Sequence, residues 1–307
     1  MTLAAPTAPP TGYLVRPPRG TPIVVALLAA AFCGGLGLGL AARGLSTGPS
    51  LAGYLSYAVA CVLGLFCFGA LYLAYAAAAL RYIVDRNGLA IQWGTMRVLV
   101  PMSDIERIVL GRSLGAPRVR GLNLPGLHVG RGEVRRLGEV CFFSTHRTPD
   151  DLLYVVTPDA TYGLTVREPA RFALEVQRAQ EVGPEVQLRH APVRGFVAAL
   201  PFWLDRWAQG LMLAAAVAAV LVGIVVYARF NSLPATITVR FPEGSVVRVG
   251  SRSAVLAIPV FGAILLVVNA GGALLVRNVS RVMALTLLAA TLACELALAI
   301  GALNAVR

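Results

Sequence analysis

The sequence has no lysine and little charge of either sign. All 27 basic residues among its 307 are arginine, and only 14% of the residues are charged. The mean hydropathy is +0.72. Soluble domains carry about 25% charged residues, and disordered chains combine low hydrophobicity with high charge, so the composition excludes both classes. The exclusive use of arginine has two interpretations, a GC-rich codon bias and selection for bidentate anion contacts.

The cysteines and histidines predict no disulfide framework and no metal site. Four of the five cysteines lie in long apolar runs, where cysteine behaves as a small hydrophobe, which leaves only Cys141 in the polar part of the chain. His128, His146 and His190 lack the paired spacing of zinc ligands. We therefore expect no metal ion and no cofactor.

Motifs of catalysis are equally scarce. Residues 111–115 match G-x-S-x-G, but no helix-forming segment follows Ser113, as a nucleophile elbow requires. The glycine-rich run 34–39 lies inside an apolar stretch and is no phosphate loop. The sequence predicts no catalytic residue.

Five apolar stretches are long enough to cross a membrane, which takes roughly 20 residues. They cover residues 21–42, 51–80, 207–227, 254–276 and 282–303, with arginines at their ends. Residues 1–20 read as a flexible Pro-rich tail before a signal anchor. More arginines flank the predicted spans on the side of residues 81–206 than on the other, which favours a cytoplasmic polar domain in a multi-pass protein of the cell (inner or plasma) membrane.

Short strands and turns dominate residues 81–166. Alternating apolar segments are separated by turn residues such as Asn87-Gly88. Pro169 then opens a helical segment in which Phe172, Ala173 and Val176 share a face. About seven strands and a C-terminal helix, over residues 81–182, predict a small closed antiparallel β-barrel inserted into an α-helical membrane protein.

Several segments of this domain resemble bacterial pleckstrin-homology-like (PH-like) domains. They are residues 82–85, 88–89, 100–105, 124–130, 142–145, 161–164 and 168–172. The resemblance implies a seven-stranded barrel with a capping helix, non-catalytic and used for binding or assembly.

Two further segments lie outside the predicted spans: one links the polar domain to the third span, and the other links the third span to the fourth. Residues 183–206 are expected to form a linker that lies in the membrane interface. Residues 230–253 predict an extramembrane hairpin. Residues 233–241, Gly244 and residues 248–252 resemble the motif of an uncharacterised bacterial membrane family with immunity-type and signalling members, although Arg240 stands where that family has histidine.

Residues 107–136 hold a dense group of arginines. One interpretation is contact with anionic lipid headgroups; the other is a solvated loop, partly neutralised by nearby glutamates. Aromatic side chains are not interleaved with the group, so nucleic acid is not an expected partner. The candidate lipid- or anion-binding residues are Arg118, Arg120, Arg131, Arg135 and Arg136.

A few residues inside the apolar stretches stand out. Glu295 is the one acid within a predicted span, and Asn269 is the clearest amide, so both are candidates for intramembrane polar contacts. Gly35 and Gly39 form a G-x-x-x-G pattern that lets helices approach closely.

These features favour a non-enzymatic membrane protein that acts as a scaffold, assembly factor or accessory subunit. Its expected partners are membrane lipids and other membrane-protein subunits. A second hypothesis is an envelope sensor or immunity-type regulator that uses the hairpin. A third is a transporter that uses Glu295.

Overall fold

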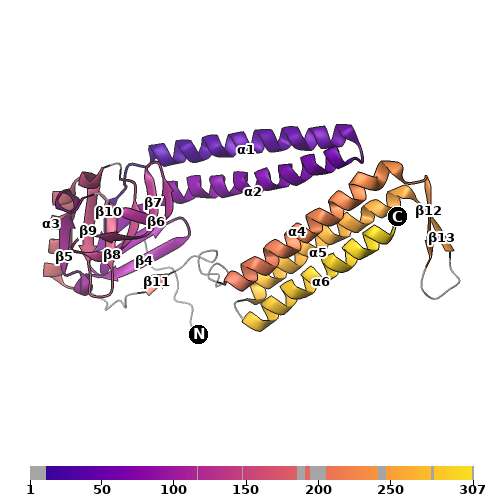
Figure 1. Cartoon of the computed structure of the whole chain (residues 1–307). Coiled ribbons are helices and arrows are strands. Elements are labelled where there is room, and N and C mark those ends of the chain that lie inside the picture. The colour runs from indigo at the N-terminus through magenta and orange to yellow at the C-terminus, as the bar shows by residue number, and fades with distance from the viewer. Residues whose placement is uncertain are drawn as a thin grey trace. The chain divides into compact units, whose positions relative to one another are not determined.

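The computed structural model describes residues 12–115, 117–146, 148–184, 191–193, 205–240, 247–277 and 280–305. The chain divides into two compact units (Figure 1). The first comprises Met1–Phe32 and Cys67–Ala199, and the second comprises Cys33–Phe66 and Leu200–Arg307. Two long helices, α1 (Gly20–Thr47) and α2 (Leu51–Ala79), contribute residues to both units.

Five helices are long and apolar enough to cross a membrane, as the sequence predicted. Besides α1 and α2 they are α4 (Arg206–Arg229), α5 (Ala257–Val276) and α6 (Arg281–Ala305). Only 11–28% of the most apolar window of each helix is buried, so most apolar side chains face outward. Outward-facing leucines, valines and phenylalanines would be unfavourable in water, and this distribution indicates a membrane protein.

Small residues bring α4, α5 and α6 together in the second unit. Ala208, Ala273 and Ala284 are almost fully buried with Leu288 in one cluster. Val222, Val226, Val255 and Ala302 form another. Short side chains allow close approach of helices, and van der Waals packing then supplies the attraction that lipid cannot.

Two β-sheets and one helix make up the polar part of the first unit. The first sheet has the order β1 (Tyr13–Val15), β2 (Arg81–Asp85), β3 (Gly88–Trp93), β4 (Met96–Pro101) and β11 (Ala191–Val193). The second has the order β5 (Arg107–Leu110), β9 (Leu152–Val156), β10 (Thr161–Thr165), β8 (Gly138–Ser144), β7 (Leu127–Val134) and β6 (Arg118–Leu124).

The closed, seven-stranded antiparallel barrel was a wrong prediction. Among the described residues the strands form two separate sheets, and β8 pairs in parallel with β10. Residues 118–134, which we had not assigned to strands, form the β6–β7 hairpin. Residues 13–15 of the expected tail and residues 191–193 of the expected linker add edge strands to the first sheet. Alternation predicts which way side chains face, whereas strand partners depend on distant segments.

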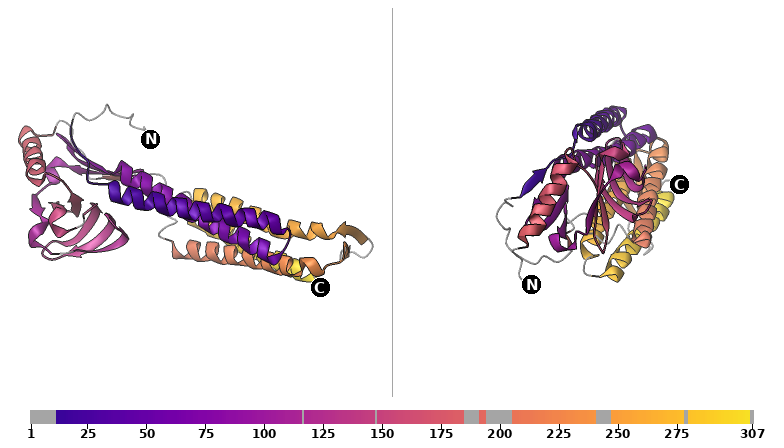
Figure 2. Two further views of the ribbon diagram at one scale, coloured as in Figure 1. Left: turned by 90° about the horizontal axis from the view of Figure 1, so that it is seen from above. Right: turned by 90° about the vertical axis from the view of Figure 1, so that its left-hand side faces the viewer.

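Helix α3 (Pro169–Val182) covers the core of this unit, as expected. Pro169 occupies the first turn, and Gly183 follows the last turn with φ +78°. Phe172 and Val176 are buried against strand residues that include Tyr82 and Leu89. Figure 2 shows α3 alongside the strands.

The first turns of α1 and the last turns of α2 are seated on the same domain. Ile23 packs against the domain core, and Ala77 and Leu80 belong to it. Gly126, in the β6–β7 turn with φ +74°, lies so close to α1 that a Cβ there would be 3.3 Å from Cδ of Pro22. The β6–β7 turn therefore meets the beginning of the first long helix.

The predicted hairpin between α4 and α5 is present. Strands β12 (Thr236–Arg240) and β13 (Val247–Ser251) pair antiparallel over five residues each. The side chain of Arg240 and the connecting residues 241–246 lie outside the described part.

Candidate anion-binding groove

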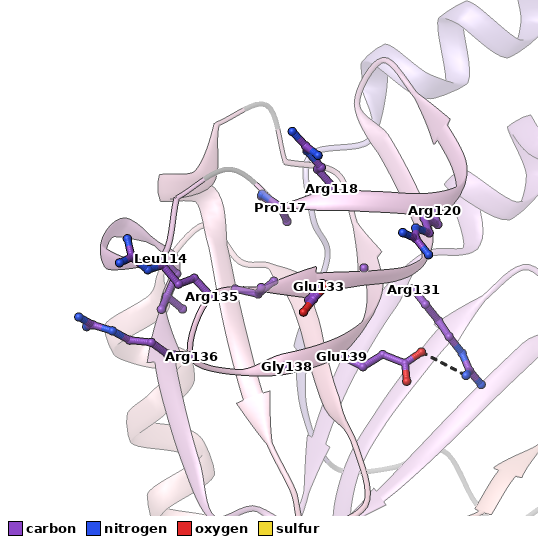
Figure 3. A pocket seen from close by; sticks show the side chains of 12 residues that line it. Leu114, Pro117, Arg118, Arg120, Arg131, Glu133, Arg135, Arg136, Gly138 and Glu139 are labelled. Carbon is purple, nitrogen blue, oxygen red and sulfur yellow. Dashed lines mark hydrogen bonds and ion pairs between the residues drawn. The ribbon is translucent and has the colours of Figure 1, made fainter.

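An open groove of about 830 Å³ lies along β6, β7 and the start of β8. Its lining contains all five arginines singled out from the sequence (Figure 3): Arg118, Arg120, Arg131, Arg135 and Arg136. Glu133 and Glu139 are its only acidic residues. Five arginines against two glutamates leave an excess of three positive charges on this surface.

Strand alternation explains why the arginines share one face. Arg118 and Arg120 are two residues apart on β6, and Arg131 and Glu133 are two residues apart on β7, so all four point to the same side. The opposite face of these strands carries Val119, Val134, Val140 and Phe142, which meet in a small apolar cluster. Further along the arginine face, Leu122, Val129 and Cys141 pack against the main core of the domain. Buried apolar side chains on both faces fix the register, and the arginines lie where the strands extend beyond the main core.

The register places two like charges directly opposite each other. Arg120 pairs with Arg131 across β6 and β7. Like charges at opposite positions destabilise a sheet by roughly 0.2–1 kcal/mol. Arg131 is also 3.2 Å from Glu139, but both side chains are more than 60% exposed, so this ion pair contributes little. An anion bound between the two arginines would relieve their repulsion.

The β7–β8 turn adds the last two arginines at one end of the groove. Arg136 has φ +71°, the only positive φ of a non-glycine residue in the described part of the chain. Gly138 follows with φ +73°, and the N–H of Leu137 donates to the carbonyl of Val134 over 3.1 Å. This tight turn places Arg135 and Arg136 at the opposite end of the groove from Arg120 and Arg131 (Figure 3).

Two histidines lie against each other on the face of the same sheet that is opposite to the arginines. The rings of His128 and His146 are 4.1 Å apart, and His128 Nε2 donates to the carbonyl of His146 over 3.1 Å. Ser144 Oγ lies 2.9 Å from Nδ1 of His146. Burial, and secondarily the charge of a protonated His128, lower the pKa of His146 to about 4. Burial also lowers the pKa of His128.

These histidines do not form a metal cluster with Cys141. No three His, Cys, Asp or Glu side chains converge in a metal-like arrangement among the residues that the structure describes. Cys141 shares the face of Arg131, and burial raises the pKa of its thiol. His190 lies outside the described residues.

The polar residues within the long helices lie at two neighbouring places. Asn269 Nδ2 donates to Oγ1 of Thr291 over 3.0 Å. Glu295 is fully buried, and neither of its oxygens has a hydrogen-bond partner among the described residues. A Cβ at Gly262 would lie 2.8 Å from Oε2 of Glu295, so this glycine makes room for the carboxyl group.

The G-x-x-x-G pattern does not pack against another helix of the described chain. Nothing lies within 4 Å of a Cβ built on Gly35 or Gly39. Gly37 instead faces α2, where a Cβ would be 3.5 Å from the carbonyl of Ala60 and from Cβ of Leu63. The α1–α2 contact therefore uses the glycine between the two that we had chosen.

Sequence reasoning missed a charge cluster at the start of α4. Asp205 caps this helix by accepting from the N–H groups of Trp207 and Ala208. Its carboxylate is also 3.1 Å from Arg277 and 2.9 Å from Arg281. The hydrogen bond from Arg281 is the main reason that the pKa of Asp205 is lowered to about 2. An acid immediately before an apolar span was the available signal.

Comparison with known proteins identifies one part of the chain. Residues 80–180 match the model of the bacterial PH domain family. No curated protein and no solved structure matches the chain. Residues 80–180 thus form a PH-like domain, in agreement with the resemblance seen in the sequence.

Proposed function

We propose that the protein is a multi-pass membrane protein whose PH-like domain binds an acidic segment of a partner protein in the arginine groove. Its role would be non-catalytic, as a scaffold, assembly factor or accessory subunit of a larger membrane complex. The observation that carries the proposal is the groove itself, where five arginines share one surface with two glutamates. Arginine is suited to bidentate recognition of carboxylates.

The repulsion between Arg120 and Arg131 supports a binding role. The two side chains occupy directly opposed positions, which lowers the stability of the sheet when no anion is present. The positive φ of Arg136 is a second local cost in the same groove. A surface that concentrates like charges at a cost in stability attracts ligands of the opposite charge.

The position of the groove favours a protein partner over the membrane that the helices would cross. The β6–β7 turn at Gly126 meets the start of α1, whereas Arg135 and Arg136 lie at the other end of β7. An eight-residue strand is about 26 Å long. Screening limits the attraction of exposed charges to roughly 8 Å at physiological salt. The far end of the groove is better placed for an acidic protein segment.

The order of the helices sets the topology that accompanies this proposal. The PH-like domain follows two candidate spans, and the β12–β13 hairpin follows a third. If all five helices cross, the domain and the hairpin lie on opposite sides of the membrane. The arginine distribution supports a cytoplasmic position of the domain.

Co-purification in a gentle detergent tests the proposal. We expect a partner to be retained by the wild type and lost from Arg118→Gln/Arg120→Gln. The matched control, Arg97→Gln/Arg178→Gln, removes two exposed arginines elsewhere on the same domain and should keep the partner. A wild type that is always purified alone, or a partner that both double variants retain, would reject the proposal.

A second candidate function is an envelope sensor or immunity-type regulator. The observation that favours it is the paired β12–β13 hairpin between two candidate spans, in the segment that resembles the immunity-type family. Deletion of residues 236–251 should then abolish an envelope-stress phenotype while expression and membrane insertion stay normal. An unchanged phenotype would exclude this candidate.

A further inference from the structure

A second cavity lies where the start of α1 meets the PH-like domain. Its volume is about 720 Å³, within the range of roughly 300–1,000 Å³ that is usual for small-molecule sites. Residues 18–22, at and before the first turn of α1, line one side. The ends of β8 and β10 supply Thr145 and Thr165 on the other side.

Charges of both signs line this cavity, namely Asp150 and Asp151 together with Arg19, Arg112 and Arg167. Arg112, Arg167 and Asp150 are exposed lining residues, and none of the three has an ion-pair partner among the described residues. Arg19 also lines the cavity and donates to the carbonyl of Ala78 at the end of α2. Arginines and an aspartate that have no ion-pair partner around one cavity are suited to a ligand that carries both a negative and a positive charge.

The wall of the cavity holds an unused polar group. Thr145 is 3% exposed, and its Oγ1 has no hydrogen-bond partner among the residues that the structure describes. Its backbone N–H donates to Oγ1 of Thr165 over 3.1 Å, so the hydroxyl is the donor that remains for a ligand. A buried hydroxyl without a partner destabilises the fold, and a ligand that pairs with it removes this cost. The positive end of the α1 dipole adds a preference for an anion on the opposite side.

The place of the cavity along α1 corresponds to the headgroup layer of a bilayer. With 28 residues, α1 is about 42 Å long, whereas the hydrocarbon core is about 30 Å thick and the bilayer with its headgroup regions about 40–45 Å. The first turn of a helix that crosses such a bilayer lies among phosphates and amines. This step depends on the proposed membrane crossing of α1.

We propose that this cavity binds the headgroup of a zwitterionic phospholipid with a primary amine, the phosphatidylethanolamine class. Arg112 and Arg167 hold the phosphate, with the N-terminal turn of α1 behind it. Asp150 accepts hydrogen bonds from the ammonium group, and Thr145 Oγ1 donates to a phosphate oxygen. The bound headgroup fixes the PH-like domain against the membrane at the start of α1.

Native mass spectrometry of the full-length protein in detergent tests the assignment. The probes are phosphatidylethanolamine, phosphatidylcholine and phosphatidylglycerol with identical acyl chains. We expect retention of phosphatidylethanolamine above both others. Arg112→Gln/Arg167→Gln should reduce it by at least tenfold, because two charge-assisted hydrogen bonds are lost and one alone accounts for about tenfold. The control Arg97→Gln/Arg178→Gln should bind like the wild type. Asp150→Ala should make phosphatidylethanolamine and phosphatidylcholine bind equally, because it removes the acceptor for the hydrogen bonds that a primary ammonium donates and a quaternary amine cannot.

Other outcomes overturn the proposal. Equal binding of the three lipids by the wild type, or unchanged lipid preference in both cavity variants, contradicts it. Soluble O-phosphoethanolamine that binds as tightly as the lipid would show that the ligand is a free phosphate ester. Alkaline extraction of membranes separates this failure from that of the proposed function. A wild type that resists extraction but shows no headgroup preference refutes only the headgroup site, whereas a wild type released by extraction refutes the membrane crossing itself.

Discussion

The buried histidine pair predicts that the PH-like domain loses stability in mild acid. His146 has a pKa of about 4 in the folded domain, against 6.5 for an unperturbed histidine. At pH 5 it is therefore neutral when folded and mostly protonated when unfolded, and protonation favours the unfolded chain. Linkage between these two pKa values lowers the free energy of unfolding by about 2 kcal/mol between pH 7 and pH 5. The lowered pKa of His128 acts in the same direction.

Urea denaturation of the full-length protein in detergent at pH 7 and pH 5 measures this effect. Trp93 lies on β3 in the PH-like domain, so its fluorescence reports the domain once Trp203 and Trp207 are replaced by phenylalanine. His146→Gln keeps a polar side chain beside Ser144 but does not titrate. It should remove most of the difference between the two pH values. A pH dependence that is equally large in His146→Gln would refute the reasoning.

Three further perturbations have expected outcomes. Arg120→Gln should raise the unfolding free energy by a few tenths of a kcal/mol by removing the repulsion with Arg131, measured by the same denaturation; a loss of stability would contradict the like-charge argument. Gly223→Ala should weaken the contact of α4 with Tyr54, because the new Cβ would clash with the tyrosine ring. Cross-linking between cysteines introduced into α2 and α4 measures this contact, and unaltered cross-linking in the variant would refute the prediction. Asp205→Asn should lower the thermal stability in detergent, since Arg277 and Arg281 lose their carboxylate, whereas the control Asp159→Asn should not.

Composition and periodicity were sufficient for the elements that depend on local sequence. Long apolar runs predicted the five helices, and Pro169 with Phe172 and Val176 predicted α3. The arginine candidates also gather in one groove, because residues two apart on a strand face the same way. Whether the groove binds an anion stays a prediction.

The features that sequence reasoning missed depend on distant partners. Strand β1 pairs with β2 across nearly seventy residues, and β8 pairs in parallel with β10 although β9 lies between them in the chain. Asp205 meets Arg277 and Arg281 more than seventy residues away. The β6–β7 hairpin is different, since Pro125 and Gly126 between alternating segments were a local signal for it. We had weighed this segment as a lipid contact or a charged loop, and residues 124–130 as part of the PH-like resemblance, without assigning strands to it.

Photo-cross-linking in intact cells tests the central claim most directly. A photoreactive residue at Pro117 lies in the arginine groove, and one at Leu174 lies on the exposed side of α3 as a control. The account predicts one discrete protein adduct from position 117, none of that size from position 174, and its loss when Arg118→Gln/Arg120→Gln is added. Equal adducts from both positions, or an adduct at position 117 that survives the loss of both arginines, would contradict it.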